Sequence, residues 1–400
     1  MASLIVVLLF GFLAGSQAAQ SIEPRERNPD IDLTTPELIA KYGYPVESHM
    51  VTTEDGYILT LQRIPYGRNS TSRTNRPPVL IQHGLLSQSS DWVVMGPEKA
   101  LGYILADAGY DVWLGNARGN TWSRKHTTLK PSSAKFWEFT WHEMGVYDLP
   151  AVIDYILEKT GEEKLFYVGH SEGTTMSYVM ASERPEYNDK LRALISLAPV
   201  AHLSHTKTPF LKVIASAGDQ IGWLTKMMGM NEFLPHSYLY NLMGYALCKD
   251  KAITQEICSN FIFLICGFDS KELDASMIPV IMGHDPAGVS TRTLLHYAQV
   301  IKSGKFRQYN HGLLKNLILY GSVVPPQYDL KKITAPVALM YGQNDFLADP
   351  EDVATLKEEL PNVISYYKVK DDQFNHVDFM WATHAKTLLY DEVVSVMNKH

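Results

Sequence analysis

A serine, an aspartate and a histidine occupy positions from which they could together activate a hydroxyl nucleophile. Ser171 lies in the pentapeptide Gly-His-Ser-Glu-Gly at 169–173, between an apolar run and a helical pattern. This G-x-S-x-G arrangement is typical of a strand-to-helix turn that exposes a nucleophilic serine. The glycines matter because a Cβ on either side would collide with the neighbouring strand and helix. The pattern predicts nucleophilic catalysis by Ser171.

The hydroxyl of serine is a weak nucleophile, so it needs a base and an acid that orients the base. Hydrolases with this turn carry the three groups in the chain order serine, acid, histidine. Asp345 follows the apolar strand-like run 337–341, and His376 follows the next such run, 363–367. We therefore predict that Asp345 is the acid and His376 the base.

Other acids and histidines lie near these positions. Asp349 is explained as the N-cap of a helix, and Asp378 comes after the histidine in chain order. His83 precedes the serine, so we expect it to form hydrogen bonds within its own loop. We therefore prefer Asp345 to either acid as the orienting acid, and His376 to His83 as the base.

Acyl transfer also needs two hydrogen-bond donors for the oxyanion of the tetrahedral intermediate. One donor is normally the backbone N–H of the residue after the serine, which is Glu172 in this chain. The loop His-Gly-Leu-Leu at 83–86 follows an early strand-like run, and Gly84 allows a close backbone approach. We predict that the amides of Leu85 and Glu172 are the two donors.

Apolar strand-like runs alternate with helical patterns along most of the chain. An Asp-Gly pair at 55–56 lies between two β-prone segments, as in a hairpin turn. Alternating strands and helices are typical of a parallel sheet, so we predict an α/β fold with a mostly parallel, helix-covered sheet. The strand-like runs are 79–81, 112–114, 165–168, 194–197, 337–341 and 363–367.

The alternation lapses over residues 203–328, where Met, Phe, Leu and Tyr are frequent. We interpret this segment as a helical cap inserted between two strands. Its stretches 233–240 and 261–265 could line an acyl-chain cavity or form a lid, but packing within the cap explains them equally well. The core then comprises residues 19–202 and 329–400.

The N-terminus predicts a secretory route. An apolar run is followed by Ser16-Gln17-Ala18, small residues that suit signal-peptidase cleavage, so we expect a signal peptide at 1–18. The run is short for a membrane anchor. A formal net charge of −7 without a basic run argues against nucleic-acid binding and suits a lipid or other neutral substrate.

The three cysteines, Cys248, Cys258 and Cys266, fall in one short stretch. An oxidising compartment favours one disulfide with one thiol left over, and the sequence leaves the pairing open. They are not accompanied by a C-x2-C or H-x3-H group, so we expect no metal, and no organic cofactor is implied. A sequon at Asn69, in a polar stretch, predicts N-glycosylation.

Further motifs extend along the chain: Tyr42-Gly43-Tyr44-Pro45, Thr53-Glu54-Asp55-Gly56-Tyr57, His83-Gly84-Leu85-Leu86, Asn116-Ala117-Arg118-Gly119-Asn120, Cys266-Gly267-Phe268-Asp269 and Asn375-His376. With the serine turn, they resemble the acid lipase family, the gastric and lysosomal acid lipases and their insect relatives. The resemblance covers nearly the whole mature chain. It implies an α/β-hydrolase core, a helical cap with a lid, and hydrolysis of triacylglycerols or cholesteryl esters by Ser171, Asp345 and His376.

The resemblance also implies a Cys248–Cys258 disulfide with Cys266 free, a secreted or lysosomal location and action at a lipid–water interface. Glu172 departs from the family pattern, because mammalian members carry glutamine after the nucleophile. We expect its charge to influence the pH dependence of catalysis. Two rival functions stay open. One is a small-ester carboxylesterase with the same triad, and the other is a non-catalytic lipid carrier, which the retained Ser, Asp and His disfavour.

Overall fold

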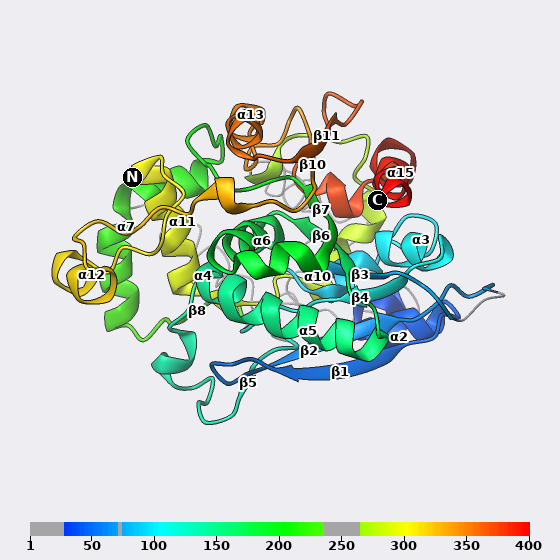
Figure 1. Ribbon diagram of the computed structural model, residues 1–400, viewed down its shortest axis with the longest axis horizontal. Helices are drawn as coiled ribbons and strands as arrows, with labels where there is room; N and C mark the ends of the chain where they lie inside the picture. Colours follow the sequence, from blue (N-terminus) through cyan, green and yellow to red (C-terminus); the bar gives the residue numbers. More distant parts are fainter. Residues whose placement is uncertain (1–27, 71–73, 236–264) are drawn as a thin grey trace, which may run out of the picture.

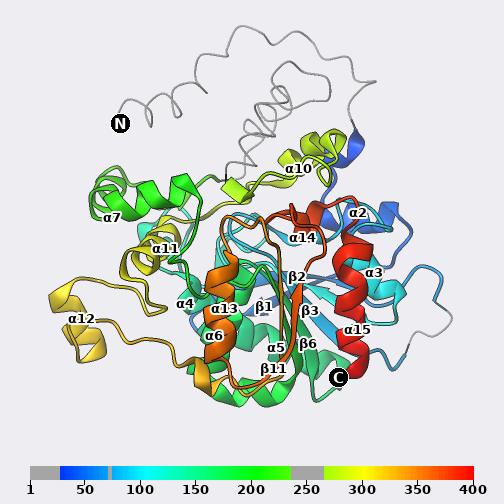
Figure 2. The ribbon, with the colours of Figure 1, turned by 90° about the horizontal axis from the view of Figure 1, so that it is seen from above.

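The computed structural model describes residues 28–70, 74–235 and 265–400. The predicted signal peptide, Cys248 and Cys258 lie outside these residues, as do most of the stretches 233–240 and 261–265. A nine-stranded sheet runs through the centre of the molecule, with helices packed around it (Figures 1 and 2). Its strand order is β1-β2-β4-β3-β6-β7-β10-β11, and β5 pairs with β2.

The sheet begins with an antiparallel hairpin, as predicted. β1 (Glu47–Thr52) pairs with β2 (Tyr57–Ile64) around the Asp-Gly turn at 55–56, and β2 also pairs with β4 and with the short β5 (Lys125–His126). Gly56 has φ +96°, a left-handed conformation that side chains with a Cβ rarely adopt. The hairpin therefore forms the antiparallel edge of the sheet.

The remaining strands pair in parallel and confirm all six predicted runs. Most of their side chains are buried, because helices pack around the sheet and leave a near-continuous apolar pattern in each strand. Parallel strands bring their carboxyl ends to one edge, where polar loops can meet. They are β3 (Pro78–Gln82), β4 (Asp111–Leu114), β6 (Leu165–His170), β7 (Leu191–Leu197), β10 (Val337–Tyr341) and β11 (Val363–Lys368).

The helices begin and end where local chemistry favours it. The helix before the serine turn ends at Gly161, which is left-handed with φ +70°, and the helix after β10 begins at the predicted cap Asp349. The longer core helices are α2 (Thr35–Lys41), α3 (Leu101–Asp107), α5 (Leu149–Thr160), α6 (Glu172–Glu183), α13 (Pro350–Glu359) and α15 (Asp391–Lys399).

Shorter helical turns connect these elements. They are η1 (Pro29–Ile31), η2 (Ser89–Trp92), η3 (Ala134–Trp137), α4 (Trp141–Glu143), η4 (Met144–Asp148), η5 (Pro185–Lys190), η6 (Ala275–Met277), η7 (Leu330–Lys332), α14 (Asp378–Trp381) and η8 (Lys386–Tyr390). Across the described part of the chain, no helix combines the length and the apolar character needed to cross a membrane.

A long insertion separates β7 from β10, and its regular elements over residues 203–235 and 265–328 are mostly helices. Two short strands within it form a separate antiparallel sheet. Its α10 packs on the N-terminal η1, where a Cβ on Gly283 would lie 2.7 Å from the carbonyl oxygen of Ile31. The described elements of the insertion are α7 (Pro209–Met227), β8 (Glu232–Phe233), α10 (Ile278–His284), β9 (Val289–Ser290), α11 (Thr291–Ser303) and α12 (Leu313–Tyr320), besides η6.

Candidate active site

Ser171 lies at the turn between β6 and α6. Its backbone has φ 51° and ψ −116°, a conformation that costs a non-glycine residue about 1–3 kcal/mol. The turn is fixed to the next strand by a hydrogen bond from the Ser171 amide to the carbonyl of Leu197, at 3.0 Å. The sharp turn therefore holds the serine at the carboxyl edge of the sheet.

The glycines around the serine are required by close backbone contacts. A Cβ on Gly169 would lie 2.8 Å from the backbone of Gly173, and one on Gly173 would lie 2.5 Å from the carbonyl oxygen of Gln82. A Cβ on Gly84 would lie 3.0 Å from that of Ser171. These collisions are the ones predicted for the two glycines of the pentapeptide. They show that strand β3, its following loop and helix α6 meet at the serine.

The structure brings Ser171, Asp345 and His376 together. Nε2 of His376 lies 2.8 Å from Oγ of Ser171, and Nδ1 lies 2.9 and 2.8 Å from the two carboxylate oxygens of Asp345. Asp345 is fully buried and also accepts hydrogen bonds from the amides of Leu347 and Ala348, at 2.9 and 2.8 Å. The carboxylate is thus fixed on one side by backbone and on the other by the imidazole.

The loop that carries His376 is supported by residues that the sequence did not single out. Nε2 of His170 donates to the carbonyl of His376 at 2.9 Å, and the His376 amide donates to the carbonyl of Cys266 at 3.2 Å. Asn375 donates to the carbonyl of Gly267 at 3.1 Å. Burial holds the pKa of His170 well below its usual value, so this imidazole is neutral. The only sequence signal was that His170 adjoins the serine.

The loop after β3 and the first residue of α6 border Ser171 on two sides. Leu85 follows Gly84, which lies against Ser171, and the carbonyl of Leu86 accepts a hydrogen bond from Ala287 at 2.6 Å. The amide of Glu172 is the first in α6, and the amides of a first helical turn have no acceptor within the helix. Both predicted donors therefore belong to backbone adjoining the serine.

His83 has the structural role that was expected. Nδ1 donates to the carbonyl of Gly84 at 2.8 Å, and Nε2 accepts a hydrogen bond from the amide of Ala117 at 3.1 Å. Burial lowers the pKa of His83 to about 4, so the ring is neutral. This histidine ties the loop after β3 to the loop after β4.

The two competing acids also have structural partners. Asp349 accepts a hydrogen bond from the amide of Glu351 at 3.0 Å and caps α13, as predicted. Asp378 accepts one from the amide of Asn375 at 2.6 Å, and burial raises its pKa well above the usual range. Asp378 therefore stabilises the turn that presents His376, whereas Asp345 contacts the imidazole itself.

Glu172 is buried beside the serine and faces the inserted segment. Its carboxyl group lies near the side chain of Tyr297 of α11, whose hydroxyl donates to the hydroxyl of Thr175 at 3.3 Å. Burial raises the pKa of Glu172 to about 8, so the group is neutral in acidic and neutral solution. The expected charge beside the oxyanion therefore arises only in alkaline solution.

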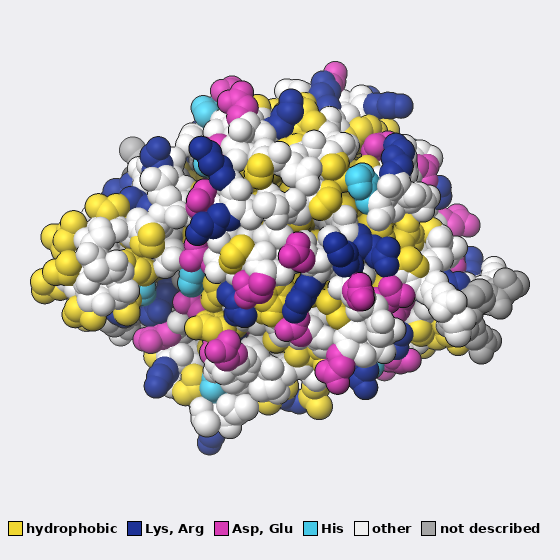
Figure 3. All heavy atoms as spheres, viewed as in Figure 1, with side chains coloured by type: hydrophobic (Ala, Val, Ile, Leu, Met, Phe, Trp, Pro, Cys, Tyr) yellow, Lys and Arg dark blue, Asp and Glu magenta, His cyan; other side chains and the backbone are white. Residues whose placement is uncertain are grey.

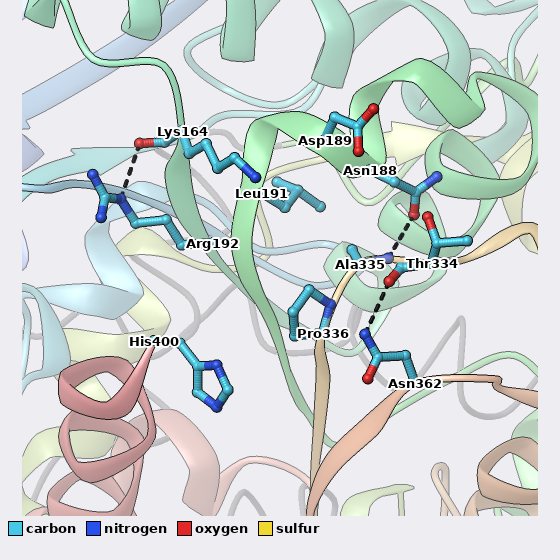
Figure 4. Close-up of a pocket in the computed structure, with 10 residues that line it drawn as sticks. All are labelled: Lys164, Asn188, Asp189, Leu191, Arg192, Thr334, Ala335, Pro336, Asn362 and His400. Carbon is cyan, nitrogen blue, oxygen red and sulfur yellow. Dashed lines mark hydrogen bonds between the residues drawn. The ribbon is translucent and has the colours of Figure 1, made fainter.

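A surface hollow of about 350 Å³ lies at the opposite edge of the sheet. Figure 4 shows its lining residues, among them Lys164, Arg192, Pro336 and His400. The first three lie just before or at the start of β6, β7 and β10, and His400 is the last residue of the sequence. Ser171, in contrast, follows the carboxyl end of β6. The hollow is therefore separate from the serine site.

The other predicted features are placed as follows. Asn69 is exposed in a turn, and the thiol of Cys266 is free and buried. Cys248 and Cys258 lie outside the described residues. Over 28–70, 74–235 and 265–400, no group of three or more His, Cys, Asp or Glu side chains is arranged to hold a metal ion.

Comparisons with known proteins place the chain in a family. Residues 77–383 match the model of the alpha/beta hydrolase fold, and residues 35–96 match that of a partial alpha/beta-hydrolase lipase region. The chain is 44% identical to gastric triacylglycerol lipase of Mus musculus over 93% of each protein. It is 40% identical to lysosomal acid lipase/cholesteryl ester hydrolase of Macaca fascicularis, over 93% of this chain and 92% of the relative.

A solved structure agrees with the fold. A soluble variant of monoglyceride lipase from Saccharomyces cerevisiae superposes with a TM-score of 0.53 at 18% identity, covering 90% of this chain and 98% of the other. The fold and these relatives define an ester hydrolase of the α/β-hydrolase class. The chain belongs to the acid lipase family, together with the gastric and lysosomal lipases.

Proposed function

We propose that the protein hydrolyses lipid carboxylic esters, triacylglycerols or cholesteryl esters, through a Ser171–His376–Asp345 triad. The observation that carries the proposal is the continuous chain of contacts from the Ser171 hydroxyl through both ring nitrogens of His376 to the buried carboxylate of Asp345. This arrangement suits a nucleophile, a general base and an orienting acid. Relatives that align with over nine-tenths of this chain are a gastric triacylglycerol lipase and a lysosomal acid lipase/cholesteryl ester hydrolase, which favours lipid esters as the substrate class.

In the proposed reaction, Oγ of Ser171 attacks the ester carbonyl carbon while Nε2 of His376 takes the hydroxyl proton. The amides of Leu85 and Glu172 stabilise the oxyanion, and the intermediate collapses as His376 gives its proton to the leaving alcohol. Water then attacks the acyl-enzyme, His376 takes a proton from it, and the fatty acid leaves as that proton returns to Ser171. Asp345 keeps Nδ1 protonated and stabilises the imidazolium.

The inserted segment is proposed to be the cap over this site. Support comes from Tyr297 of α11, which reaches the residue after the nucleophile, and from the hydrogen bond between Ala287 and the carbonyl of Leu86. Elements of the insertion thus contact both segments that carry the proposed oxyanion donors. We assign residues 203–328 to the cap and residues 19–202 and 329–400 to the core.

We also propose that the protein enters the secretory pathway and is secreted or lysosomal. The apolar N-terminal run at 1–18, the exposed sequon at Asn69 and the gastric and lysosomal relatives support this route. A Cys248–Cys258 disulfide with Cys266 free fits the same compartment. Mass spectrometry of the purified protein before and after reduction and deglycosylation tests all three modifications.

A fluorophosphonate probe tests the triad, because it labels activated serines. Labelling of the wild type, with none of Ser171→Ala, is expected, and equal labelling of both would reject Ser171 as the nucleophile. Hydrolysis of long-chain triacylglycerol, cholesteryl ester and short-chain esters at acidic and neutral pH then identifies the substrate. Turnover of short-chain esters alone would favour the small-ester carboxylesterase, and lipid binding without turnover or labelling would favour the carrier.

A further inference from the structure

The inserted segment ends in a loop that exposes apolar side chains to solvent on most sides. We define the α12 loop as residues 306–328, with α12 at its tip. Figure 3 shows hydrophobic side chains gathered over α12 at one end of the molecule. Seven large apolar residues of the loop are exposed, by 48–81%: Leu313, Leu314, Leu317, Ile318, Leu319, Val323 and Val324. A soluble surface rarely gathers this many apolar side chains without a partner.

The stem of the α12 loop is anchored in the core. Its two strands are joined by hydrogen bonds from Gln308 to the carbonyl of Pro326 and from Tyr328 to that of Phe306, at 3.0 and 3.1 Å. Phe306 and Tyr328 are buried, and both rings pack against Trp141. The stem therefore holds the tip in a fixed position.

The tip is tied mainly to its own loop. Asn316, the only buried residue of α12, donates to the side chain of Asn310 and to the carbonyl of Val323, both at 2.8 Å. Its side-chain oxygen accepts from the amide of His311 at 2.8 Å. The hydroxyl of Tyr320 donates to the carbonyl of Tyr309 at 2.9 Å, so two polar side chains of the helix tie it to its own loop.

The most exposed residues of α12 are Leu314 and Ile318, each at 81%. Residues four apart lie on one face of a helix, and at 100° per residue this face is opposite Asn316 and Tyr320, which bond to the loop. Leu313 and Leu317 widen the same face. The loop therefore presents an apolar ridge that points away from the protein.

The charge around the ridge is positive. Residues 286–328 contain five Lys or Arg and no Asp or Glu, in a chain of net charge −7. Lys315 lies on α12 itself, and Lys302 and Lys305 are exposed in the segment that leads to the loop. The acidic groups nearby belong to other elements and are engaged. Glu143 accepts hydrogen bonds from Thr140, and Glu138 pairs with Arg292.

We propose that the α12 loop docks the protein on a lipid surface that carries anionic phospholipid, a proposal that rests on the proposed lipid-ester hydrolysis. A fluid lipid phase can surround a protruding helix, whereas a second protein copy would need a matching groove. Apolar side chains that enter the lipid and cations at the level of the headgroups are the two signals that together give stable attachment. Figures 1 and 2 place α12 at the same end of the molecule as α7, and Met227 and Met228, at and just after the end of α7, are also exposed.

The test measures partitioning of the purified protein onto phosphatidylcholine vesicles with and without phosphatidylserine. The double variant Leu314→Ser/Ile318→Ser is expected to bind both vesicles about tenfold more weakly or worse, because two large apolar side chains no longer enter the lipid. Lys315→Gln is expected to lose about fivefold on the anionic vesicles only. Met50→Ser, which changes an exposed methionine of β1, is the matched control and is expected to bind as the wild type does.

Unchanged partitioning of the double variant, with an unchanged melting temperature, would overturn the proposal. A dimer in sedimentation velocity that the double variant dissociates, with vesicle binding intact, would instead assign the ridge to a second copy. Soluble short-chain ester hydrolysis separates this proposal from the proposed function. If the protein binds vesicles through α12 but cleaves no ester, only the proposed hydrolysis is refuted. If it cleaves esters but does not need α12 for vesicle binding, only the proposed docking is refuted.

Discussion

The serine site and the α12 loop differ in almost every physical respect. At the serine site, polar groups are buried, and each of Ser171, Asp345 and His376 has hydrogen-bond partners at 2.8–3.3 Å. On α12, apolar groups are exposed, and the side chains of Asn316 and Tyr320 tie the helix to its own loop. Bond-forming chemistry requires reacting atoms held within a fraction of an ångström, whereas contact with a fluid lipid needs only apolar area in the right place.

This contrast implies that the two regions tolerate different changes. A backbone shift at the serine breaks several contacts at once, because β3, β6 and α6 meet there without room for a Cβ. Substitutions on the α12 ridge disturb no packed neighbour, so their effects should be confined to docking. The two functions should therefore be separable by mutation.

Among the variants, Ser171→Ala should separate ester hydrolysis from vesicle binding most strongly. Removing the proposed nucleophile should lower kcat/KM for every ester by at least about 10⁴-fold. Binding to anionic vesicles should stay as in the wild type, because α12 is untouched. Parallel measurements of ester hydrolysis and vesicle partitioning check both statements, and a loss of vesicle binding in Ser171→Ala would contradict the separation.

Crowding at the serine is tested by a pair of helical glycines. Gly173→Ala should lower the free energy of unfolding by about 1–3 kcal/mol, because the new Cβ meets the carbonyl oxygens of Gln82 and His83 at 2.5 and 3.0 Å. Gly218→Ala in α7 is the matched control. Its Cβ would lie 3.7 Å from Ala298, so better helix propensity should stabilise the protein by up to about 1 kcal/mol. Equal urea midpoints for both variants would be evidence against crowding.

The pH dependence of the serine site should change in Glu172→Gln. Because burial raises the pKa of Glu172 to about 8, the carboxyl is neutral below pH 7 and the variant should match the wild type there. As pH rises through 8, the wild type gains a negative charge beside the oxyanion and the variant does not. The variant-to-wild-type ratio of kcat/KM should rise by up to about tenfold by pH 9. Glu163→Gln, at an exposed position, is the control. A kcat/KM ratio for Glu172→Gln that stays constant with pH would reject the influence of Glu172 on the pH dependence.

The smallest effect is expected from a buried acid pair that joins the insertion to the core. Asp91 and Asp285 are both buried and interact electrostatically, and burial raises the pKa of both, so the folded state binds their protons more tightly than the unfolded chain does. Their contribution to stability is complete below the usual carboxyl pKa and is lost as pH rises through the raised values. Asp285→Asn should therefore reduce the loss of melting temperature between pH 5 and 8.

The control for this variant is Glu358→Gln, which changes an exposed acid of α13. Its melting temperature should follow that of the wild type at every pH. A parallel fall of the Asp285→Asn and wild-type melting temperatures between pH 5 and 8 would mean that the pair carries none of the pH dependence.

Much of the fold followed from local patterns. The Asp-Gly turn, the six strand-like runs and the cap at Asp349 were all predicted correctly, because each depends on residues within a few positions. The glycines of the pentapeptide likewise predicted close contacts that the structure contains. The short β8–β9 sheet and the packing of α10 on η1 were not predicted, because both depend on partners distant in the chain.

The sequence by itself determined the strand order in the chain, the strained turn at residue 171 and the identity of the groups that could do chemistry, since turn geometry and reactivity are properties of short segments. Only the tertiary structure decided that His170 supports His376, that Tyr297 contacts Glu172, and that the leucines of α12 face solvent. A leucine-rich helix has the same sequence pattern whether its leucines are buried or exposed. Burial and the pKa shifts that come from it are set by neighbours that the fold brings from elsewhere in the chain.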